Sequence, residues 1–409
     1  MNGFYRKGII SIADQALFAG SNFLLNILLA RWLSQNDFGV FTTIYSWFFI
    51  LLGIQTALFV DPLLVYGPGL YKDVFTNYIH HLIKINFLFI FISSIFIGIL
   101  GCISTSIELR IGFFGLAISS MFILFQFLIR RTFYVISKPE ISLIGGIIYS
   151  ILLIFLLYIS YRLKIASLFL AFIMIGLANL GSLIWFFYKL KSNFKSNTTF
   201  LSRNEILENH WRYGRWALAT SILSWIPNNL FFSVLAFQGN FLENAALKAI
   251  MNTILPIQHS FNAITTVLVP DFVKVAIEKS VQGIRKAIVK PFLIFTIIAI
   301  LYFIFLSIFK DWVLFLLYQD KYIIYAYLLP YVGIIPIFGA GFNVFTSALR
   351  ALNRPKEIFW SYFFTSFFII SIGVYLVLTF GIIGAIISII FSSALVFFFL
   401  FFFLFIFNR

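Results

Sequence analysis

The feature that most constrains this chain is a series of long apolar stretches that cover most of its length. A helix needs about 20 mostly apolar residues to cross a bilayer, whereas strands of a membrane barrel would be about ten residues long and would alternate in polarity. The stretches are long and do not alternate, so we predict an all-α polytopic membrane protein with about 12 transmembrane helices. The predicted spans are residues 9–32, 38–60, 80–104, 110–133, 141–161, 165–188, 213–237, 244–270, 288–309, 322–348, 357–379 and 381–406.

The composition agrees with a chain that is solvated by lipid. Hydrophobic residues make up 62% of it and charged residues 11%, whereas a soluble domain carries about 25% charged residues. The sequence contains no G-x-x-x-x-G-K-[ST] and no H-E-x-x-H, and Cys102 is its single cysteine. We therefore expect no nucleotide site, no metal site, no cofactor and no enzyme activity.

The net charge of +15 would suggest nucleic acid binding in a soluble protein. Here Lys and Arg flank the spans, and 22 of the 29 fall on the side that also holds both termini. The other seven, Lys248 among them, fall on the opposite side. Because cytoplasmic loops are enriched in cations, we predict a multi-pass protein of the cytoplasmic (inner) membrane with both termini in the cytoplasm.

The chain is predicted to form two six-helix lobes. The most polar connection, residues 189–212, lies at the middle of the chain as a cytoplasmic linker between a lobe of residues 1–188 and a lobe of residues 213–409. Comparison of residues 6–44 with residues 212–250 gives 9 identities in 39 positions, where chance would give about three. Six spans per lobe would make the two lobes a parallel pseudo-repeat.

Polar residues inside the spans are candidates for a substrate site, because such residues usually face the interior of a helix bundle. Asp14 and Asn22 lie in the first span and Asn228 lies in the seventh, beside Pro227. Further amides occur in the eighth and tenth spans, at Asn252, Gln258, Asn262 and Asn343. They either form hydrogen bonds between helices or line a hydrated central cleft.

Several arginines lie at the predicted cytoplasmic ends of spans. They are Arg130 and Arg131 after the fourth span, Arg212 and Arg215 at the start of the seventh, and Arg350 at the end of the tenth. The guanidinium fork matches paired phosphate oxygens, so these residues could bind pyrophosphate and sugar. Each of them could equally be a plain topology anchor.

The N-terminal part of the chain, from Asp14 to Pro62, resembles a known family. It contains Asp14-Gln15-Ala16, Ser21-Asn22-Phe23, Leu29-Ala30-Arg31, Phe38-Gly39-Val40-Phe41 and Asp61-Pro62. This order is similar to the start of bacterial polysaccharide-repeat flippases, the O-antigen and capsule exporters of the MATE-like MOP superfamily.

The resemblance implies that the chain moves an undecaprenyl-pyrophosphate-linked oligosaccharide across the membrane by alternating access. The implied partners are this lipid-linked substrate, membrane lipid, and polysaccharide polymerase and chain-length proteins. Asp14, the acid well inside the first span, is the candidate for a coupling carboxylate. It could instead form a salt bridge with an arginine at the cytoplasmic end.

Two other functions fit the architecture. A cation-coupled multidrug antiporter of the MATE type would need several acids in its cleft, and the first span has only Asp14. A membrane polysaccharide polymerase or glycosyltransferase would need a large outer loop, and the predicted outer connections are short. The sequence therefore favours an anionic substrate and transport.

The charge asymmetry predicts the side on which each loop lies. Single cysteines in a Cys102→Ser background should react with an impermeant thiol reagent from outside the cell only in the outer loops. We expect labelling around Glu108, Lys164 and Asp311, and protection around Lys138, Lys195 and Lys286. Two consecutive loops on the same side would contradict the twelve-span topology.

Overall fold

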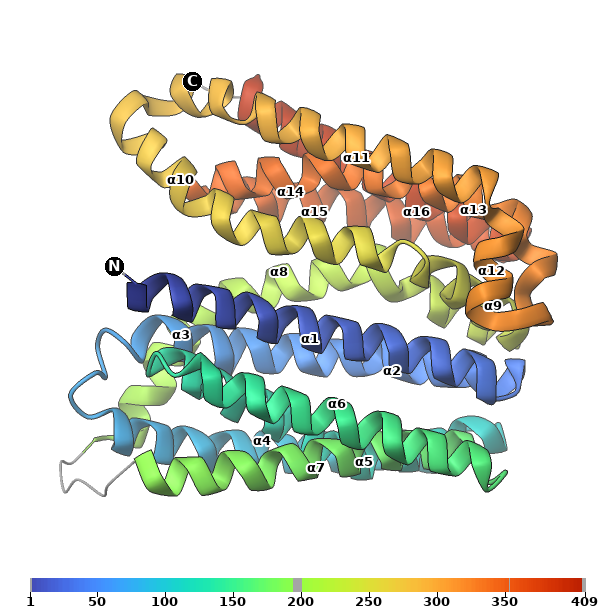
Figure 1. Cartoon of the computed structure of the whole chain (residues 1–409), viewed down its shortest axis with the longest axis horizontal. Helices are drawn as coiled ribbons and strands as arrows, with labels where there is room; N and C mark the ends of the chain where they lie inside the picture. The colour runs from blue at the N-terminus through green and yellow to red at the C-terminus, as the bar shows by residue number, and fades with distance from the viewer. Residues whose placement is uncertain (1, 194–200, 353, 407–409) are drawn as a thin grey trace. The chain divides into compact units, whose positions relative to one another are not determined.

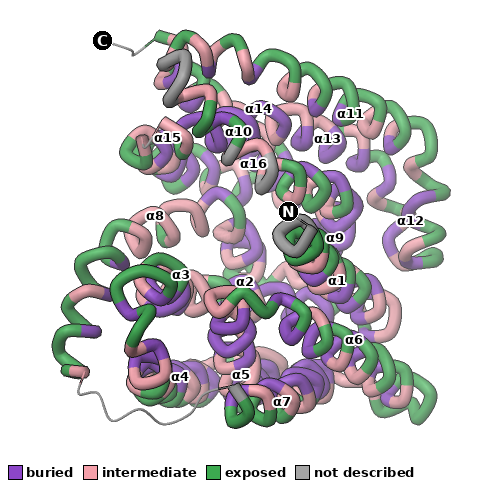
Figure 2. Tube along the Cα trace, turned by 60° about the vertical axis from the view of Figure 1, so that its left-hand side comes forward, coloured by how far each residue is buried: buried purple, intermediate pink, exposed green. Residues whose placement is uncertain are grey.

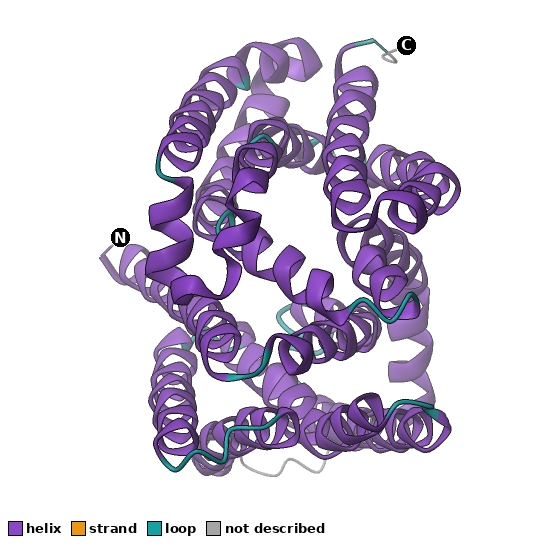
Figure 3. Ribbon diagram, turned by 90° about the vertical axis from the view of Figure 1, so that its right-hand side faces the viewer, coloured by secondary structure: helices purple, strands orange, loops and turns teal. Residues whose placement is uncertain are grey.

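The computed structural model describes residues 2–193, 201–352 and 354–406. Within these ranges the chain is helical, with short connections and no strand (Figure 3). Ten of the described helical segments are long and apolar enough to cross a membrane. The predicted all-α membrane fold is therefore confirmed.

The chain divides into two compact units, the first consisting of Met1–Leu33 and Thr43–Ile222. In this unit α5 packs against α4 and α7, while α6 packs against α1 and α7 (Figure 1). Small residues allow the close approach of α5 and α7: a Cβ at Gly176 would lie 2.9 Å from the Cβ of Ser119. The helices of this unit are α1 (Asn2–Trp32), α2 (Gln35–Gln55), the π-helix η1 (Thr56–Val60), α3 (Asp61–Tyr66), α4 (Phe75–Ile103), α5 (Ile107–Val135), α6 (Pro139–Arg162), α7 (Leu168–Asn193) and the first part of α8 (Arg203–Phe237).

The second unit consists of Ser34–Thr42 and Leu223–Arg409. Here α14 packs against α10, α11 and α16, and α15 packs against α16. Besides the ends of α2 and α8, its helices are α9 (Phe241–Asn252), α10 (Leu255–Ala287), α11 (Val289–Ile308), α12 (Lys310–Tyr318), the 3-10 helix η2 (Gln319–Leu328), α13 (Leu329–Gly333), α14 (Ile335–Ala351), α15 (Pro355–Phe368), the π-helix η3 (Ile369–Gly373) and α16 (Val374–Phe405).

Two helix breaks in the second unit explain how the predicted spans relate to the helices. The predicted span 244–270 is two helices, because α9 ends at Asn252 and α10 starts with Pro256 in its first turn. The continuous α16 holds a kink at Gly381, where φ is +54°, and Gly381 is the first residue of the last predicted span. Glu243 Oε2 accepts a 2.7 Å hydrogen bond from the backbone N–H of Ile382 just after the kink.

The boundary between the units differs from the predicted linker. It falls between Ile222 and Leu223, inside α8, whereas the polarity of the sequence predicts the connection at residues 189–212. Residues 194–200 of that segment lie outside the described residues. From Arg203 onward the segment is helical, and Ile206 and His210, four residues apart, are buried in the first unit. Because they are four residues apart, the two side chains lie on the same face of α8, although the sequence around them is polar.

Many large apolar residues of the long helices are exposed, as expected where lipid is the solvent. Figure 2 shows exposed positions along these helices. On α4 the exposed residues include Phe91, Ile92, Phe96 and Ile99, each about half exposed. Asn86 and Ser93 of the same helix are buried. On α4, these polar groups therefore face the packed interior and these apolar groups face outward.

Gly39 allows a close backbone contact inside the second unit. A Cβ at this position would lie 1.9 Å from the carbonyl oxygen of Phe241, at the start of α9. Nearby, the Asn244 side-chain amide donates to the carbonyls of Phe232 at 2.9 Å and Gly39 at 3.5 Å. The backbone of α2 is therefore held directly against α9.

We predict that Gly39→Ala destabilises the protein by about 1–3 kcal/mol, because the added methyl forces backbone to move. Thermal unfolding in detergent measures the change. Gly20→Ala is the matched control, since a Cβ at Gly20 meets nothing within 4 Å. Equal melting temperatures for the two variants would contradict the close contact.

Candidate functional site

A buried ion pair links α1 and α5 in the first unit. The Arg130 Nη2 atom of α5 lies 2.7 Å from the Asp14 Oδ2 atom of α1, and Arg130 Nε donates to the same oxygen at 3.2 Å. Arg130 Nη2 also donates to the backbone carbonyl of Asp14 at 3.2 Å, and the Tyr134 hydroxyl donates to Oδ2. Asp14 is 0% exposed and Arg130 is 2% exposed. The carboxylate is therefore neutralised within its own unit.

The surroundings of this pair hold its geometry. The Arg130 guanidinium stacks on the Phe18 ring, 4.3 Å from its centroid, which adds a cation–π contact. Gly146 of α6 leaves the room that the carboxylate occupies, because a Cβ there would lie 3.0 Å from Asp14 Oδ1. Oδ1 is buried and has no hydrogen-bond partner among the described residues. One oxygen of Asp14 is thus bound and the other is left free.

The other polar residues of the first span have different surroundings. Asn22 is half-buried and donates to the carbonyl of Phe18 at 2.9 Å. Asn26 is buried and donates to the carbonyl of Asn22 at 2.8 Å. Gln15 is exposed. The predicted role of Asn22 in substrate binding stays a prediction.

The remaining predicted arginines have other surroundings. Arg131 is half-buried, with its guanidinium against the rings of Phe127 and Tyr134. Its Nε atom is buried and has no partner among the described residues. Arg212, Arg215 and Arg350 are exposed at helix ends or surfaces. Their roles as phosphate ligands stay predictions.

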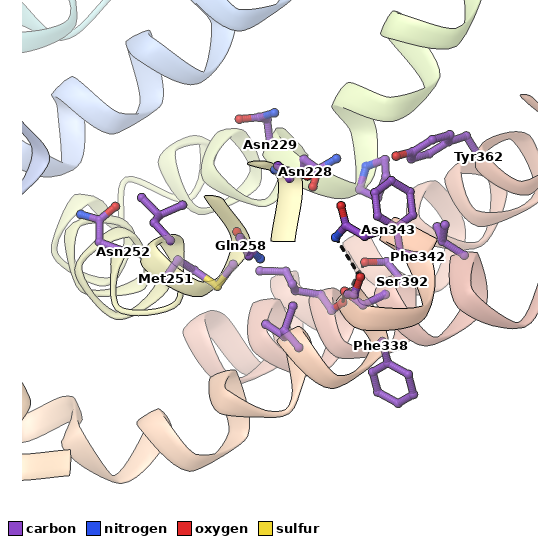
Figure 4. A pocket seen from close by; sticks show the side chains of 18 of the residues that line it. Asn228, Asn229, Met251, Asn252, Gln258, Phe338, Phe342, Asn343, Tyr362 and Ser392 are labelled. Atoms are coloured by element: carbon purple, nitrogen blue, oxygen red, sulfur yellow. Dashed lines mark hydrogen bonds between the residues drawn. The ribbon is translucent and has the colours of Figure 1, made fainter. Parts of the chain in front are cut away.

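The second unit contains a pocket of about 360 Å³ where α8, α9, α10, α14, α15 and α16 meet (Figure 4). Pro227 lies inside α8 next to Asn228 and Asn229, and Pro256 lies in the first turn of α10. The predicted polar residues of three spans meet here. Six amides line the pocket: Asn228, Asn229, Asn252, Gln258, Asn262 and Asn343.

The charge of this pocket comes from one residue. Lys248 of α9 lines it, and none of the residues that line it is a carboxylate. The Lys248 ammonium lies 5.7 Å from the centroid of the Phe232 ring, and among the described residues no salt bridge includes it. The hydroxyls of Tyr362, Ser392 and Ser393 add further polar groups. The pocket is therefore cationic and rich in hydrogen-bonding groups.

Hydrogen bonds inside the helices orient several of the amides. Asn228 donates to the carbonyl of Ser224 at 2.7 Å, and Asn343 donates to the carbonyl of Gly339 at 2.9 Å. Asn252 donates to the Tyr318 hydroxyl at 3.4 Å, while its buried Oδ1 has no partner among the described residues. A buried acceptor without a donor is costly, and Asn252 is completely buried.

Sequence reasoning missed Lys248 as a site residue. It falls among the outer cations because it lies near the start of the predicted span 244–270. A signal was present, since Asn244, Lys248 and Asn252 recur every four residues and so share one helix face. Tyr362 and Ser392 had no such signal, because only the packing of α15 and α16 brings them to the pocket.

Comparison with solved structures identifies the fold of this chain. No protein-family model and no curated protein matches the sequence. An inward-facing multidrug resistance MATE family transporter of the MOP superfamily superposes with a TM-score of 0.71 and 14% identity, over 96% of each chain. The lipid II flippase MurJ, in an inward closed conformation, superposes with a TM-score of 0.71 and 17% identity, over 96% of this chain and 87% of its own. The chain has the fold of MOP superfamily transporters.

A third solved structure of this superfamily, from Pyrococcus furiosus, has a TM-score of 0.67 and 16% identity, over 98% of this chain and 95% of its own. The binding pocket of that protein has reverse polarity, which suggests a different function for it. The MOP transporter fold agrees with the superfamily that the N-terminal part of the chain resembles. At these identities the superpositions establish the fold alone.

The ion pair of the first unit generates a prediction about stability. Asp14→Asn or Arg130→Gln alone should destabilise the protein by about 3–5 kcal/mol, because each leaves an uncompensated buried charge. The double variant should lose much less than the sum of the two. Thermal unfolding of the four proteins completes the cycle. Additive losses would show that the two side chains do not interact.

Proposed function

We propose that this chain is a flippase that moves an undecaprenyl-pyrophosphate-linked oligosaccharide, a polysaccharide repeat unit, across the cytoplasmic membrane by alternating access. Its product would feed the synthesis of O-antigen, capsule or exopolysaccharide, where a polymerase and chain-length proteins would act next. The proposal rests on the MOP transporter fold, on the resemblance of the segment from Asp14 to Pro62, and on the chemistry of the pocket in the second unit.

The observation that carries the proposal is the charge of that pocket. Its lining holds the cation Lys248 and no carboxylate. A cationic drug would meet an uncompensated like charge there, which disfavours binding. A pyrophosphate or an acidic sugar would instead gain a charge-assisted hydrogen bond from the ammonium. The polarity therefore supports an anionic substrate.

The other pocket groups suit a glycan. Sugar hydroxyls both donate and accept hydrogen bonds, and side-chain amides offer both functions. Figure 4 shows Asn228, Asn229, Gln258, Asn343 and Tyr362 around the same space. A pocket of about 360 Å³ lies in the range of small-molecule sites. It would hold part of an oligosaccharide, with the lipid tail left in the bilayer.

The structural neighbours support both the proposal and its alternative. One of them is a lipid II flippase, so this fold serves a lipid-linked substrate in that protein. Others are multidrug resistance MATE transporters, and a cation-coupled antiporter is the second candidate function. The cationic, carboxylate-free lining of the pocket favours the first of the two.

Asp14 remains the candidate for coupling in the first unit. Its carboxylate is ion-paired with Arg130, and one oxygen has no partner among the described residues. Protonation of Asp14 would weaken its attraction to Arg130 and so shift the balance between two arrangements of α1 and α5. The exposed Arg212, Arg215 and Arg350 remain candidates for the first contact with pyrophosphate.

Substitution of Lys248 tests the proposal directly. In vesicles that contain a lipid-linked oligosaccharide, Lys248→Gln should lower transport about tenfold or more, since a charge-assisted contact is worth about 1.5–3 kcal/mol. Lys248→Arg should keep much of the activity, because it retains the charge. Binding of the same substrate in detergent should fall in parallel.

Lys290→Gln is the matched control, because Lys290 is an exposed cation of the same unit and does not line the pocket. Drug and dye resistance in an exporter-deficient cell tests the antiporter. Normal glycan transport by Lys248→Gln, or drug resistance conferred by the wild-type chain without glycan transport, would reject the flippase proposal.

A further inference from the structure

A second, smaller cavity lies in the first unit, apart from the Asp14–Arg130 pair. Its volume is about 120 Å³, and it lies between η1, α4 and the start of α8. Its lining is mostly hydrocarbon, with Leu58, Phe59, Leu82, Ile85, Ile206 and Leu207 as walls and His210 and Trp211 beside them. The cavity therefore suits an apolar occupant.

The polar group in this wall, His210, already has partners for both ring nitrogens. Nδ1 lies 2.8 Å from the carbonyl of Leu58, which can only accept, so Nδ1 carries the proton. Nε2 then accepts a 2.8 Å hydrogen bond from the Tyr78 hydroxyl. His210 thus ties α8 to η1 and α4 and leaves no polar group that an occupant must satisfy.

Cations lie beside the cavity on both helices. Arg203 precedes Leu207 by four residues and His210 by seven, so it lies on the face of α8 that lines the cavity. Glu205 and Glu208 lie on the opposite face of the helix. On α4, His81 directly precedes Leu82. Both Lys84 and Arg203 lie within electrostatic reach of His81.

These cations are available to a ligand. Arg203 and Lys84 are exposed, and among the described side chains neither forms a salt bridge. Trp211 and Leu207, at the mouth of the cavity, are 55% and 41% exposed. A Trp next to basic residues is typical of the membrane–water interface, and the charge asymmetry predicts that this end is cytoplasmic.

An apolar cavity at the interface with cations at its mouth matches one class of ligand. We infer that this groove between α4 and α8 binds an anionic phospholipid of the bilayer, with part of an acyl chain in the cavity and the phosphate beside the cations Arg203 and Lys84. Basic pockets between transmembrane helices bind anionic head groups in this way. The site lies in the first unit and does not depend on the proposed transport function.

The experiment uses the full chain in phosphatidylcholine nanodiscs that contain a small fraction of spin-labelled phosphatidylglycerol or spin-labelled phosphatidylcholine. The wild type should immobilise the phosphatidylglycerol probe preferentially. Arg203→Gln should reduce this preference about fivefold, the effect of one cation near the surface. Leu207→Trp, which fills the cavity, should reduce the immobilised fraction of the phosphatidylglycerol probe even though every cation remains.

Lys191→Gln is the matched control, because it removes an exposed cation from the end of α7 in the same unit. It should keep the full preference, and all variants should show the melting temperature of the wild type in detergent without anionic lipid. Equal immobilisation of the two probes by the wild type, or equal behaviour of Arg203→Gln and Lys191→Gln, would overturn the inference.

Two competitors separate the lipid from related ligands. Water-soluble glycerophosphoglycerol should displace the phosphatidylglycerol probe poorly, because it lacks the acyl chain. Displacement as effective as that by the intact lipid would remove the role of the cavity. Undecaprenyl phosphate should compete no better than phosphatidylglycerol; stronger competition would assign the groove to a polyprenyl chain and overturn the phospholipid assignment.

Discussion

Lipid supplies no hydrogen bonds, so a polar group inside this chain is costly unless it finds a partner within the chain. The Asp14–Arg130 pair shows the strength of this constraint. A carboxylate and a guanidinium that are each almost completely buried can persist because they neutralise one another, with Tyr134 and the Asp14 carbonyl as further partners. Their hydrogen bonds hold α1 against α5, and Gly146 of α6 leaves the space they need.

In the second unit, the charged residue of the pocket is not part of an ion pair among the described residues. Lys248 lines a pocket whose other polar groups are amides and hydroxyls, and among the described residues it has no carboxylate partner. A cation that is left without a partner in a polar pocket can bind an anion, whereas a cation in a closed pair cannot do so until the pair opens. For this reason Lys248 is a stronger candidate for contact with substrate than Arg130. Arg130 is better suited to a step that changes conformation.

Much of the fold was predictable because a bilayer admits few solutions. The helical spans followed from the length and polarity of the apolar stretches, and the superfamily fold agreed with the resemblance of the N-terminal part of the chain. The interruption between α9 and α10 is not visible in the length of the apolar stretch; its one signal in the sequence is Pro256, which lies in the first turn of α10. The start of α8 was also missed as a packed helix, because its polar composition concealed the buried Ile206 and His210.

The sequence by itself determined that the chain is a bundle of membrane helices with polar residues inside spans, because hydropathy and chain length act locally along each segment. Only the tertiary structure decided which polar residues meet. It paired Asp14 with Arg130 across 116 positions, and it brought Asn228, Lys248 and Asn343 to one pocket. Their meeting depends on how helices turn and pack against one another, and small residues such as Gly39, Gly146 and Gly176 set that packing. The spacing of residues within a single helix does not identify the helix that packs against it.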